Sequence, residues 1–478
     1  MSIQAATATK LFQALFADRA VTPDLPSTFE TSRTKPWSQG NWQAAACYVL
    51  LSNTQEVSSA LNVIKETGCR FAIRSAEHNP NRGFNNADES GVVLDLSNLR
   101  SRELSADKEI AYIGAGNQWG EIYAWLEGEG RCIVGGRCAE VGMGFLLGGG
   151  YPALPNLYGL GSDNVVNLEV VLPDSRIVNA NSSENTDLFR ALKGGGSNFG
   201  IVTRFDIKTH PILDLQYSIK LYRPDDYVAI NKATIKMQEE MEAEPRIGVF
   251  TNFNPQFGAV GLVCANATGI EYDELESKLS AALPDPIMIP VPKTEGSQSS
   301  LTKVMAHPGG PQKRYVGTLS TKYSEDLYED VYLAWQKSLP KIPDGVVLHY
   351  TIQPLGAACV EKSDSHGGNV LGLEICAQCW WVFSCEWPDQ GFDSSDTEAR
   401  SALDSLVEGA QESARSKGLL LNYLTSNFAS AGQAVLQSYG AENLKLMQAA
   451  AQKYDPDGMF QKQQWGGFLL RDLPGVEA

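Results

Sequence analysis

The chain has 478 residues of ordinary globular composition, 43% hydrophobic and 20% charged, and it is too long for one small core. Its formal net charge of −17 argues against a nucleic acid or an anionic membrane as partner, because both repel acidic proteins. No apolar run approaches the roughly 20 residues of a membrane span, so we expect two domains and no membrane segment.

The first 20 residues predict a short amphipathic helix with Leu11, Phe12, Leu15 and Phe16 on one stripe. They lack the basic start and apolar core of a secretory signal, and the nine scattered cysteines favour a reducing compartment. We therefore expect a cytoplasmic protein, although a secreted chain trimmed of its leader would look the same.

Short strands alternate with helices through the first part of the chain. The predicted strands are 44–51, 70–74, 91–96, 109–115, 166–172, 176–180 and 199–209, and the predicted helices are 55–67 and 118–128. This alternation indicates an α/β unit, with a hairpin around Pro173 and Asp174.

Pro211 marks a boundary, after which alternating apolar residues predict an antiparallel sheet. Its predicted strands are 218–221, 246–253, 260–265, 345–353 and 371–386, and the predicted helices are 225–242, 325–338, 397–417 and 441–453. The segment 284–300, rich in proline and serine, predicts a loop.

The segment 134–150, VGGRCAEVGMGFLLGGG, contains seven glycines and Cys138. Such a cluster occurs where a chain turns sharply or lets a ligand approach its backbone, and bare peptide N–H groups there bind phosphate. Three further motifs accompany it: RSAEHNPNRGF at 74–84, YGLGSDNV at 158–165 and GGGSNFGIV at 194–202.

These motifs, with NVLGL at 369–373, SYGAENL at 438–444, KYDPDGMF at 453–460 and GGF at 466–468, resemble the berberine-bridge-enzyme-like family of FAD-linked oxidoreductases. That family lies within the vanillyl-alcohol-oxidase superfamily, and the resemblance covers most of the chain. It implies an α+β fold: a PCMH-type FAD-binding domain over 1–212, an antiparallel-sheet substrate domain covered by helices over 213–418, and a segment, 419–478, that returns to the first domain.

The resemblance implies a covalent bond between His78 and the 8-methyl carbon of the flavin, and a second bond between Cys138 and ring carbon C6. His78 as an ordinary loop residue and Cys138 as a small buried residue are the alternatives. Ala76 and Glu77 replace two family glycines, and the glycine stretch after Cys138 is one glycine short. We expect no metal site, because Cys376 and Cys379 lack a second ligand pair.

The resemblance assigns further residues to the FAD shell, where peptide N–H groups would hold the pyrophosphate. They are Arg74, Ser75, Asn79, Gly135, Gly136, Val141, Gly142, Gly148, Gly149, Gly150, Gly159, Gly161, Asp163, Asn164, Gly200, Ile201 and Asn422. Arg74 and Arg137 either add positive charge there or form surface ion pairs. The pattern is not a dinucleotide fingerprint of the strand–GxGxxG–helix type.

Leu420 stands where many oxidases of this family have a tyrosine base, although Asn422 and Tyr423 match the motif, and leucine cannot take a proton. We predict that a group on the middle sheet acts instead, with Glu374 first and Tyr350 second. Glu374 would share a strand face with Gln378 and Trp380, and burial would raise its pKa. Its alternative role is a structural ion pair. The remaining candidates are Gln353, Gln378, Tyr423, His349 and Glu386.

The predicted reaction is hydride transfer from a small organic substrate to flavin N5, with O2 as electron acceptor. Val141 stands where the family uses valine or leucine to admit or exclude oxygen, and Trp380 and Trp381 indicate an apolar metabolite. The alternative is an isomerase or cyclase on the same fold that does no redox chemistry.

Overall fold

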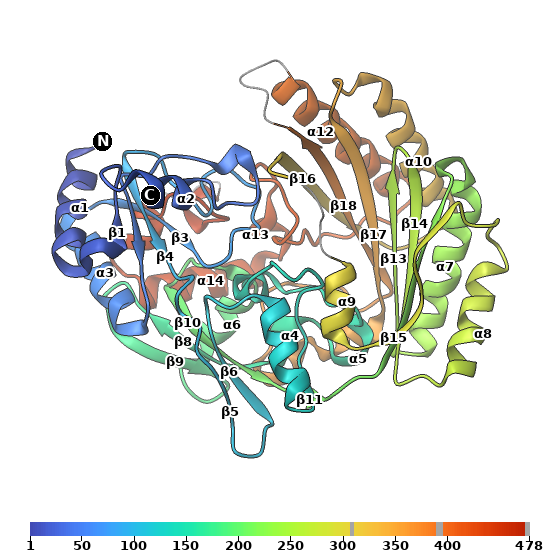
Figure 1. Cartoon of the computed structure of the whole chain (residues 1–478), viewed down its shortest axis with the longest axis horizontal. Coiled ribbons are helices and arrows are strands. Elements are labelled where there is room, and N and C mark those ends of the chain that lie inside the picture. The colour runs from blue at the N-terminus through green and yellow to red at the C-terminus, as the bar shows by residue number, and fades with distance from the viewer. Residues whose placement is uncertain (306–309, 389–394, 474–478) are drawn as a thin grey trace.

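The computed structural model describes residues 1–305, 310–388 and 395–473 of the chain. Figure 1 shows two halves side by side: the N-terminal part with the red C-terminal segment, and the middle of the chain from green to orange. Within the described residues, no helix is both long and apolar enough to cross a membrane.

A four-stranded sheet with the order β1-β2-β4-β3 begins the first half. Strand β4 lies between β2 and β3 and runs parallel to both. Helix α3 crosses over from β2 to β3, and the segment 75–90 connects β3 to β4. Asn53 caps α3 at its start, and Gly68 ends it in the left-handed conformation that suits glycine. The elements are α1 (Ile3–Phe16), β1 (Ala20–Val21), α2 (Pro26–Arg33), β2 (Cys47–Leu50), α3 (Thr54–Thr67), β3 (Arg70–Arg74) and β4 (Gly91–Asp95).

A five-stranded antiparallel sheet with the order β5-β6-β10-β8-β9 completes this half. Its strands are β5 (Arg102–Leu104), β6 (Ile110–Gly114), β8 (Val165–Val171), β9 (Ile177–Asn181) and β10 (Ile201–Lys208). The other elements are α4 (Trp119–Gly128), α5 (Pro155–Tyr158), α6 (Thr186–Gly195) and the pair β7 (Arg131–Cys132) and β11 (His210–Pro211). The predicted hairpin is β8–β9.

The middle of the chain forms a seven-stranded antiparallel sheet with the order β15-β12-β14-β13-β17-β18-β16. Its strands are β12 (Leu215–Tyr222), β13 (Ile247–Asn254), β14 (Phe257–Ala265), β15 (Met288–Gly296), β16 (Lys313–Thr321), β17 (Val347–Leu355) and β18 (Gln378–Trp387). Four helices cover the outer face of this sheet (Figure 1): α7 (Tyr227–Ala243), α8 (Gly269–Ser280), α10 (Glu325–Ser338) and α12 (Ser395–Ser416). This confirms the predicted α+β class with a helix-covered antiparallel sheet.

The two faces of the sheet have different neighbours, because side chains alternate along a strand. Tyr350 and Trp381 point toward the helices and pack in one core with Trp335 of α10. Gln353 and Trp380, which pair across β17 and β18, point toward the first half of the molecule. We call this second side the inner face.

The C-terminal segment returns to the first half through α13 (Val435–Ser438), α14 (Ala441–Tyr454) and α15 (Met459–Gln463). The Tyr454 hydroxyl donates to Asp187 in the first turn of α6 at 2.6 Å, and the Trp465 amide donates to the Phe71 carbonyl of β3 at 2.6 Å. Both contacts join residues more than 260 positions apart.

Three local predictions are wrong, and one of them is the strand predicted over 371–386, which begins only at Gln378. The segment 284–300 holds strand β15 and the start of α9 (Gln298–Val304) rather than a loop. Because β15 lies at the edge of the sheet, its prolines remove no hydrogen bond that the ladder needs. In α1, Phe12 and Phe16 are buried as predicted, but Leu11 and Leu15 face solvent, since the buried stripe continues through Ala5 and Ala8.

Candidate active site

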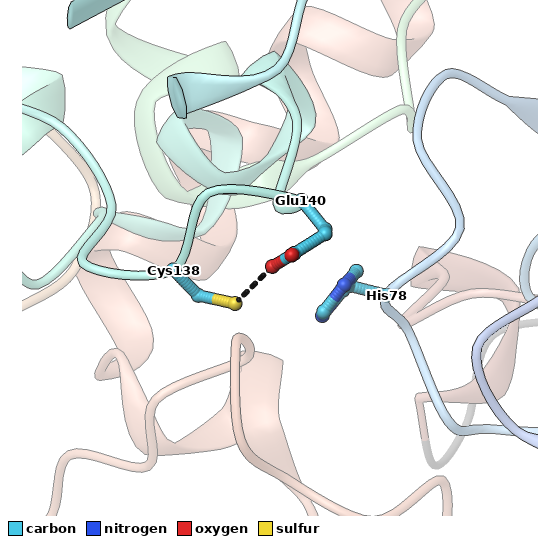
Figure 2. Close-up of side chains that lie close together, drawn as sticks. All are labelled: His78, Cys138 and Glu140. Carbon is cyan, nitrogen blue, oxygen red and sulfur yellow. Dashed lines mark hydrogen bonds between the residues drawn. The ribbon is translucent and has the colours of Figure 1, made fainter. Parts of the chain in front are cut away.

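Two loops of the first half bring His78, Cys138 and Glu140 together. His78 follows β3, while Cys138 and Glu140 precede the short helical segment η3 (Met143–Gly148). One ligand-type atom from each side chain lies within 4.8 Å of the others, and Cys138 Sγ lies 3.0 Å from Glu140 Oε2. Figure 2 shows the three side chains converging from opposite sides. His78 and Cys138, the two predicted attachment residues, thus lie close enough to contact the same flavin ring. Glu140 was not predicted; its only signal in the sequence is that it lies two residues after Cys138.

This trio is also the one group among the described residues with three side chains suited to holding a metal ion. The predicted CxxC does not take part. Cys379 lies on the helix-covered side of β18, whereas Cys376 precedes the strand.

Trp37 and Arg314 complete the surroundings of His78, and sequence reasoning missed both. The Trp37 indole stacks on the imidazole, with ring centroids 4.9 Å apart and planes 12° apart. The Arg314 guanidinium, from β16 in the second half, lies 3.9 Å from the Trp37 ring centroid. Arg314 also contacts Glu386 at 3.3 Å. The histidine is therefore held at the junction of the two halves.

The loop before His78 provides a cradle for an anion. Among the described residues, the peptide N–H groups of Ala76 and Glu77 have no acceptor in the chain, which is the arrangement that binds phosphate. The Glu77 carboxylate is compensated by Lys35 at 3.1 Å. Gly142 leaves room for Ala76, since a Cβ at 142 would lie 2.5 Å from that of Ala76. The residues present therefore fit FAD: the peptide N–H groups of Ala76 and Glu77 would hold a phosphate, and His78 and Cys138 would lie beside the ring.

The glycines at 149–161 have a different role from the one predicted. The peptide N–H groups of Gly149, Gly150, Gly159 and Gly161 already donate within the chain, so in this structure they offer nothing to a pyrophosphate. Gly149, Gly150 and Gly159 have positive φ, and a Cβ at Gly161 would collide with Leu146. The glycine run is required for tight backbone packing.

The other predicted glycines are also explained by close contacts. A Cβ at Gly135 or Gly136 would collide with the Trp119 indole, and one at Gly148 with Ser426 and Asn427. A Cβ at Gly200 would lie 2.7 Å from the Val171 carbonyl oxygen.

Arg74 is not available to a cofactor, contrary to the prediction. Its guanidinium is fully buried, contacts Asp95 at 3.0 Å and donates to the Ser32 carbonyl. The pair links the ends of β3 and β4, and Arg74 cannot turn toward a ligand without losing its buried contacts with Asp95 and Ser32.

Several predicted FAD-shell residues hold loops together. Ser75 donates to the Ala115 carbonyl, and Asn79 accepts from the Asn81 amide. Asp163 accepts from the Leu160 amide, and Asn164 donates to the Tyr158 carbonyl. Ile201 is buried at the start of β10, Val141 is half-buried and Asn422 is exposed beside Tyr423. Their contact with FAD stays a prediction.

Glu374 and Tyr350, the two leading candidates for proton transfer, do not lie where the sequence predicted them. Glu374 is exposed and precedes β18, which begins at Gln378, so it is not buried and does not share that strand's face. Tyr350 points into the helix-covered core, 5.1 Å from the Phe253 ring, and burial raises its pKa well above the usual value. Tyr350 therefore faces away from the inner face, and Glu374 lies before β18.

The inner face carries Gln353, Gln378 and Trp380, and Tyr423 lies against it. Gln378 Oε1 accepts from the Trp380 indole at 3.0 Å, and the rings of Trp380 and Tyr423 are 4.8 Å apart. Burial raises the pKa of Tyr423 well above the usual value, which makes it a poor base. Leu420 forms a bridge with Thr321 and packs on the helix-covered core.

A cavity opens between the inner face and the first half. Arg137, Tyr151 and Ala153 line it from the first half, and Leu301 of α9 and Met305, which follows α9, line it from the other side. The sheet contributes Tyr217, Ile219, Gly248, Phe250 and Val263, with the neighbouring backbone. The lining is mainly apolar, with one cation.

Residues 45–181 match the FAD binding domain family. An FAD-dependent monooxygenase of Arthrobotrys oligospora is 34% identical over 438 residues, covering 91% of this chain and 84% of that protein. The bifunctional solanapyrone synthase of Alternaria solani is 29% identical, covering 89% and 81%. In fold, the chain resembles the glucooligosaccharide oxidase of Acremonium strictum with a TM-score of 0.80 and 18% identity, covering 95% and 97%.

Fold, site and matches together define an FAD-linked oxidoreductase, and FAD is its cofactor. With 34% identity over most of both chains, the protein belongs to the same family as the Arthrobotrys oligospora FAD-dependent monooxygenase, and its fold is that of a berberine-bridge-enzyme-like protein of Physcomitrella patens, with a TM-score of 0.78 at 16% identity.

Proposed function

We propose that the protein is an oxidase that takes a hydride from a small, mainly apolar metabolite and uses O2 as electron acceptor. Bound FAD would supply the hydride acceptor and its reoxidation by oxygen. The observations that carry the proposal are the convergence of His78 and Cys138, and a mainly apolar cavity on the inner face of the sheet whose wall includes Arg137, the residue before Cys138 in sequence.

The chain's own contribution is binding and orientation. The apolar lining, with Phe250, Ile219 and Leu301, would hold the body of the substrate and exclude water. The stacked pair Trp37 and His78 would fix the position of the cofactor against that lining.

We further propose that His78 and Cys138 each form a covalent bond to FAD, in which C–N or C–S replaces one C–H of the 8-methyl group or of ring carbon C6. Each bond would release two electrons to the flavin, and O2 would take them up. A solved relative, also the glucooligosaccharide oxidase of Acremonium strictum, is described with a 6-S-cysteinyl, 8α-N1-histidyl FAD. The same two residue types stand here within 4.8 Å of Glu140 and of each other. The Glu140 carboxylate, 3.0 Å from Cys138 Sγ, would accept the thiol proton when that bond forms.

A second candidate, an isomerase or cyclase without net redox chemistry, is favoured by one observation. Leu420 has no proton to exchange, and the two predicted substitutes, Glu374 and Tyr350, lie away from the cavity. The relatives also carry both monooxygenase and synthase names.

Anaerobic mixing with substrate separates the two. Candidate substrates are small apolar alcohols, phenols and amines, screened by oxygen consumption. Loss of the flavin's visible absorption without oxygen, and its return on aeration, supports the oxidase. Product formation with unchanged flavin absorption supports the isomerase or cyclase and overturns the oxidase proposal.

A further inference from the structure

Arg137 is a cation in the cavity wall with no carboxylate partner among the described residues. Of its guanidinium nitrogens, only Nη2 has a hydrogen bond, to Gln353 Oε1 on β17. The other close group is the Tyr151 ring, whose centroid lies 4.9 Å from the guanidinium carbon. Desolvation lowers the pKa of Arg137, because it lacks the anion that would normally offset its partial burial.

Gln353 adds a second donor without an acceptor. Its side chain is fully buried, and its Nε2 has no hydrogen-bond partner in the described structure. An unpaired buried amide costs free energy, so such groups are usually satisfied by a ligand or water. The Tyr151 hydroxyl does not help, since it donates to the Pro354 carbonyl at 2.6 Å.

The rest of the cavity offers little to a polar molecule. Phe250, Ile219 and Val263 of the sheet and Leu301 and Met305 beside it are apolar. A ligand that satisfies both regions therefore has an apolar body and one group of acceptor oxygens at the Arg137 end.

We propose that Arg137 and Gln353 bind an anionic oxygen group of the substrate, which is therefore an apolar carboxylic acid, phenol or enol. A guanidinium donates charge-assisted hydrogen bonds to such groups. Arg137 and Gln353 are joined by a hydrogen bond, so one group of acceptor oxygens between them would satisfy the remaining N–H groups of both. This inference deepens the proposed oxidase, because it names the substrate class of the same cavity. It also assigns Gln353 a role that does not depend on proton transfer.

Matched probes test this on the FAD-loaded protein by isothermal titration calorimetry. The pair is 4-phenylbutyrate and the neutral 4-phenylbutanamide, which share shape and differ in charge. We expect the carboxylate to bind at least tenfold more tightly, the usual size of a hydrogen bond to a charged group. Equal affinities would overturn the inference, including the case in which FAD itself covers Arg137.

Three variants locate the effect. Arg137→Met should abolish the preference for the carboxylate. Arg131→Met is the control and should keep that preference, because Arg131 lies outside the cavity lining and donates a hydrogen bond to the Thr209 hydroxyl. Gln353→Glu places a carboxylate against Arg137 and should abolish the preference even if Arg137→Met does not fold. A preference that persists in Arg137→Met or in Gln353→Glu would overturn the inference.

4-Butylphenol separates the two sources of the anion. If phenols or enols are the natural class, its affinity should rise at least tenfold between pH 7 and pH 10 in the wild type only. If carboxylic acids are the natural class, the affinity for 4-butylphenol should not rise with pH, and 4-phenylbutyrate should still bind more tightly than 4-phenylbutanamide. Bleaching of the flavin by a turnover substrate is measured separately. If bleaching fails but the carboxylate probe still binds more tightly, the oxidase proposal is wrong and the anion-binding inference stands.

Discussion

The Trp37 indole and the His78 imidazole lie nearly parallel, 4.9 Å apart, and the Arg314 guanidinium lies over the same indole. Arg314 comes from the sheet of the second half, so this stack joins the proposed flavin attachment residue to the substrate side of the molecule. The orientation of His78 thus depends on residues about 40 and 240 positions away in sequence.

Trp37→Ala should lower the fraction of covalently bound flavin, because His78 loses the surface that orients its ring. We expect at least a twofold loss, measured as yellow colour that stays with acid-precipitated protein. Trp42→Phe serves as the control, since Trp42 donates to the Pro36 carbonyl and does not stack on His78. Unchanged attachment in Trp37→Ala would mean that the stack has no positioning role.

His78→Ala and Cys138→Ala should each remove one flavin bond, and the double variant should release all flavin in acid. Mass spectrometry of the two peptides reads each bond separately. Glu140→Gln should slow the bond at Cys138 and spare the bond at His78, because it removes the carboxylate beside Sγ. Unmodified wild-type peptides at both positions would refute the covalent proposal.

Ala76 and Gly142 should behave as a coupled pair. Gly142→Ala forces two Cβ atoms to 2.5 Å and should reduce flavin incorporation, while Ala76→Gly alone should be tolerated. The double variant Ala76→Gly with Gly142→Ala should recover incorporation, because only one Cβ then occupies the gap. If the double variant is as poor as Gly142→Ala, the contact is not the cause.

Glu374→Gln should leave kcat/KM within about twofold of wild type, since the side chain is exposed outside the cavity. Tyr350→Phe should also spare activity and change the free energy of unfolding by about 1 kcal/mol at most, because the hydroxyl has no described partner. Tyr328→Phe is the matched control: its hydroxyl donates to Gln238 at 3.0 Å, so its loss should destabilise. A 100-fold loss of turnover in Glu374→Gln would restore Glu374 as the proton-transfer group.

His210 should make the protein less stable in acid. Burial lowers its pKa to about 4 from 6.5, and its Nε2 lies 2.9 Å from Asn164 Oδ1. The unfolded chain takes up a proton at His210 near pH 6.5, whereas the folded protein does so only near pH 4. The free energy of unfolding is therefore highest above pH 6.5 and falls as the pH drops from 6.5 toward 4. Between pH 7 and pH 5 the loss should be about 2 kcal/mol by urea unfolding. His210→Gln should lose correspondingly less over that range, and an identical loss would contradict the assignment.

The sequence alone identified the family, the fold class and the pair His78 and Cys138, because these depend on local signals. The order of glycine motifs and the strand and helix periods can be read within a few tens of residues. The exact match of β3 (Arg70–Arg74) and α10 (Glu325–Ser338) with prediction shows how far such periods reach.

The tertiary structure alone decided which side chains face the cavity. A strand's period places Tyr350 and Gln353 on opposite faces, but only the packing of α10 on the sheet decides which face is the core. The same holds for Glu374, whose predicted burial depended on a strand that starts four residues later. Trp37, Arg314 and Arg137 were assigned their roles by contacts between segments far apart in the chain, and no local pattern records such contacts.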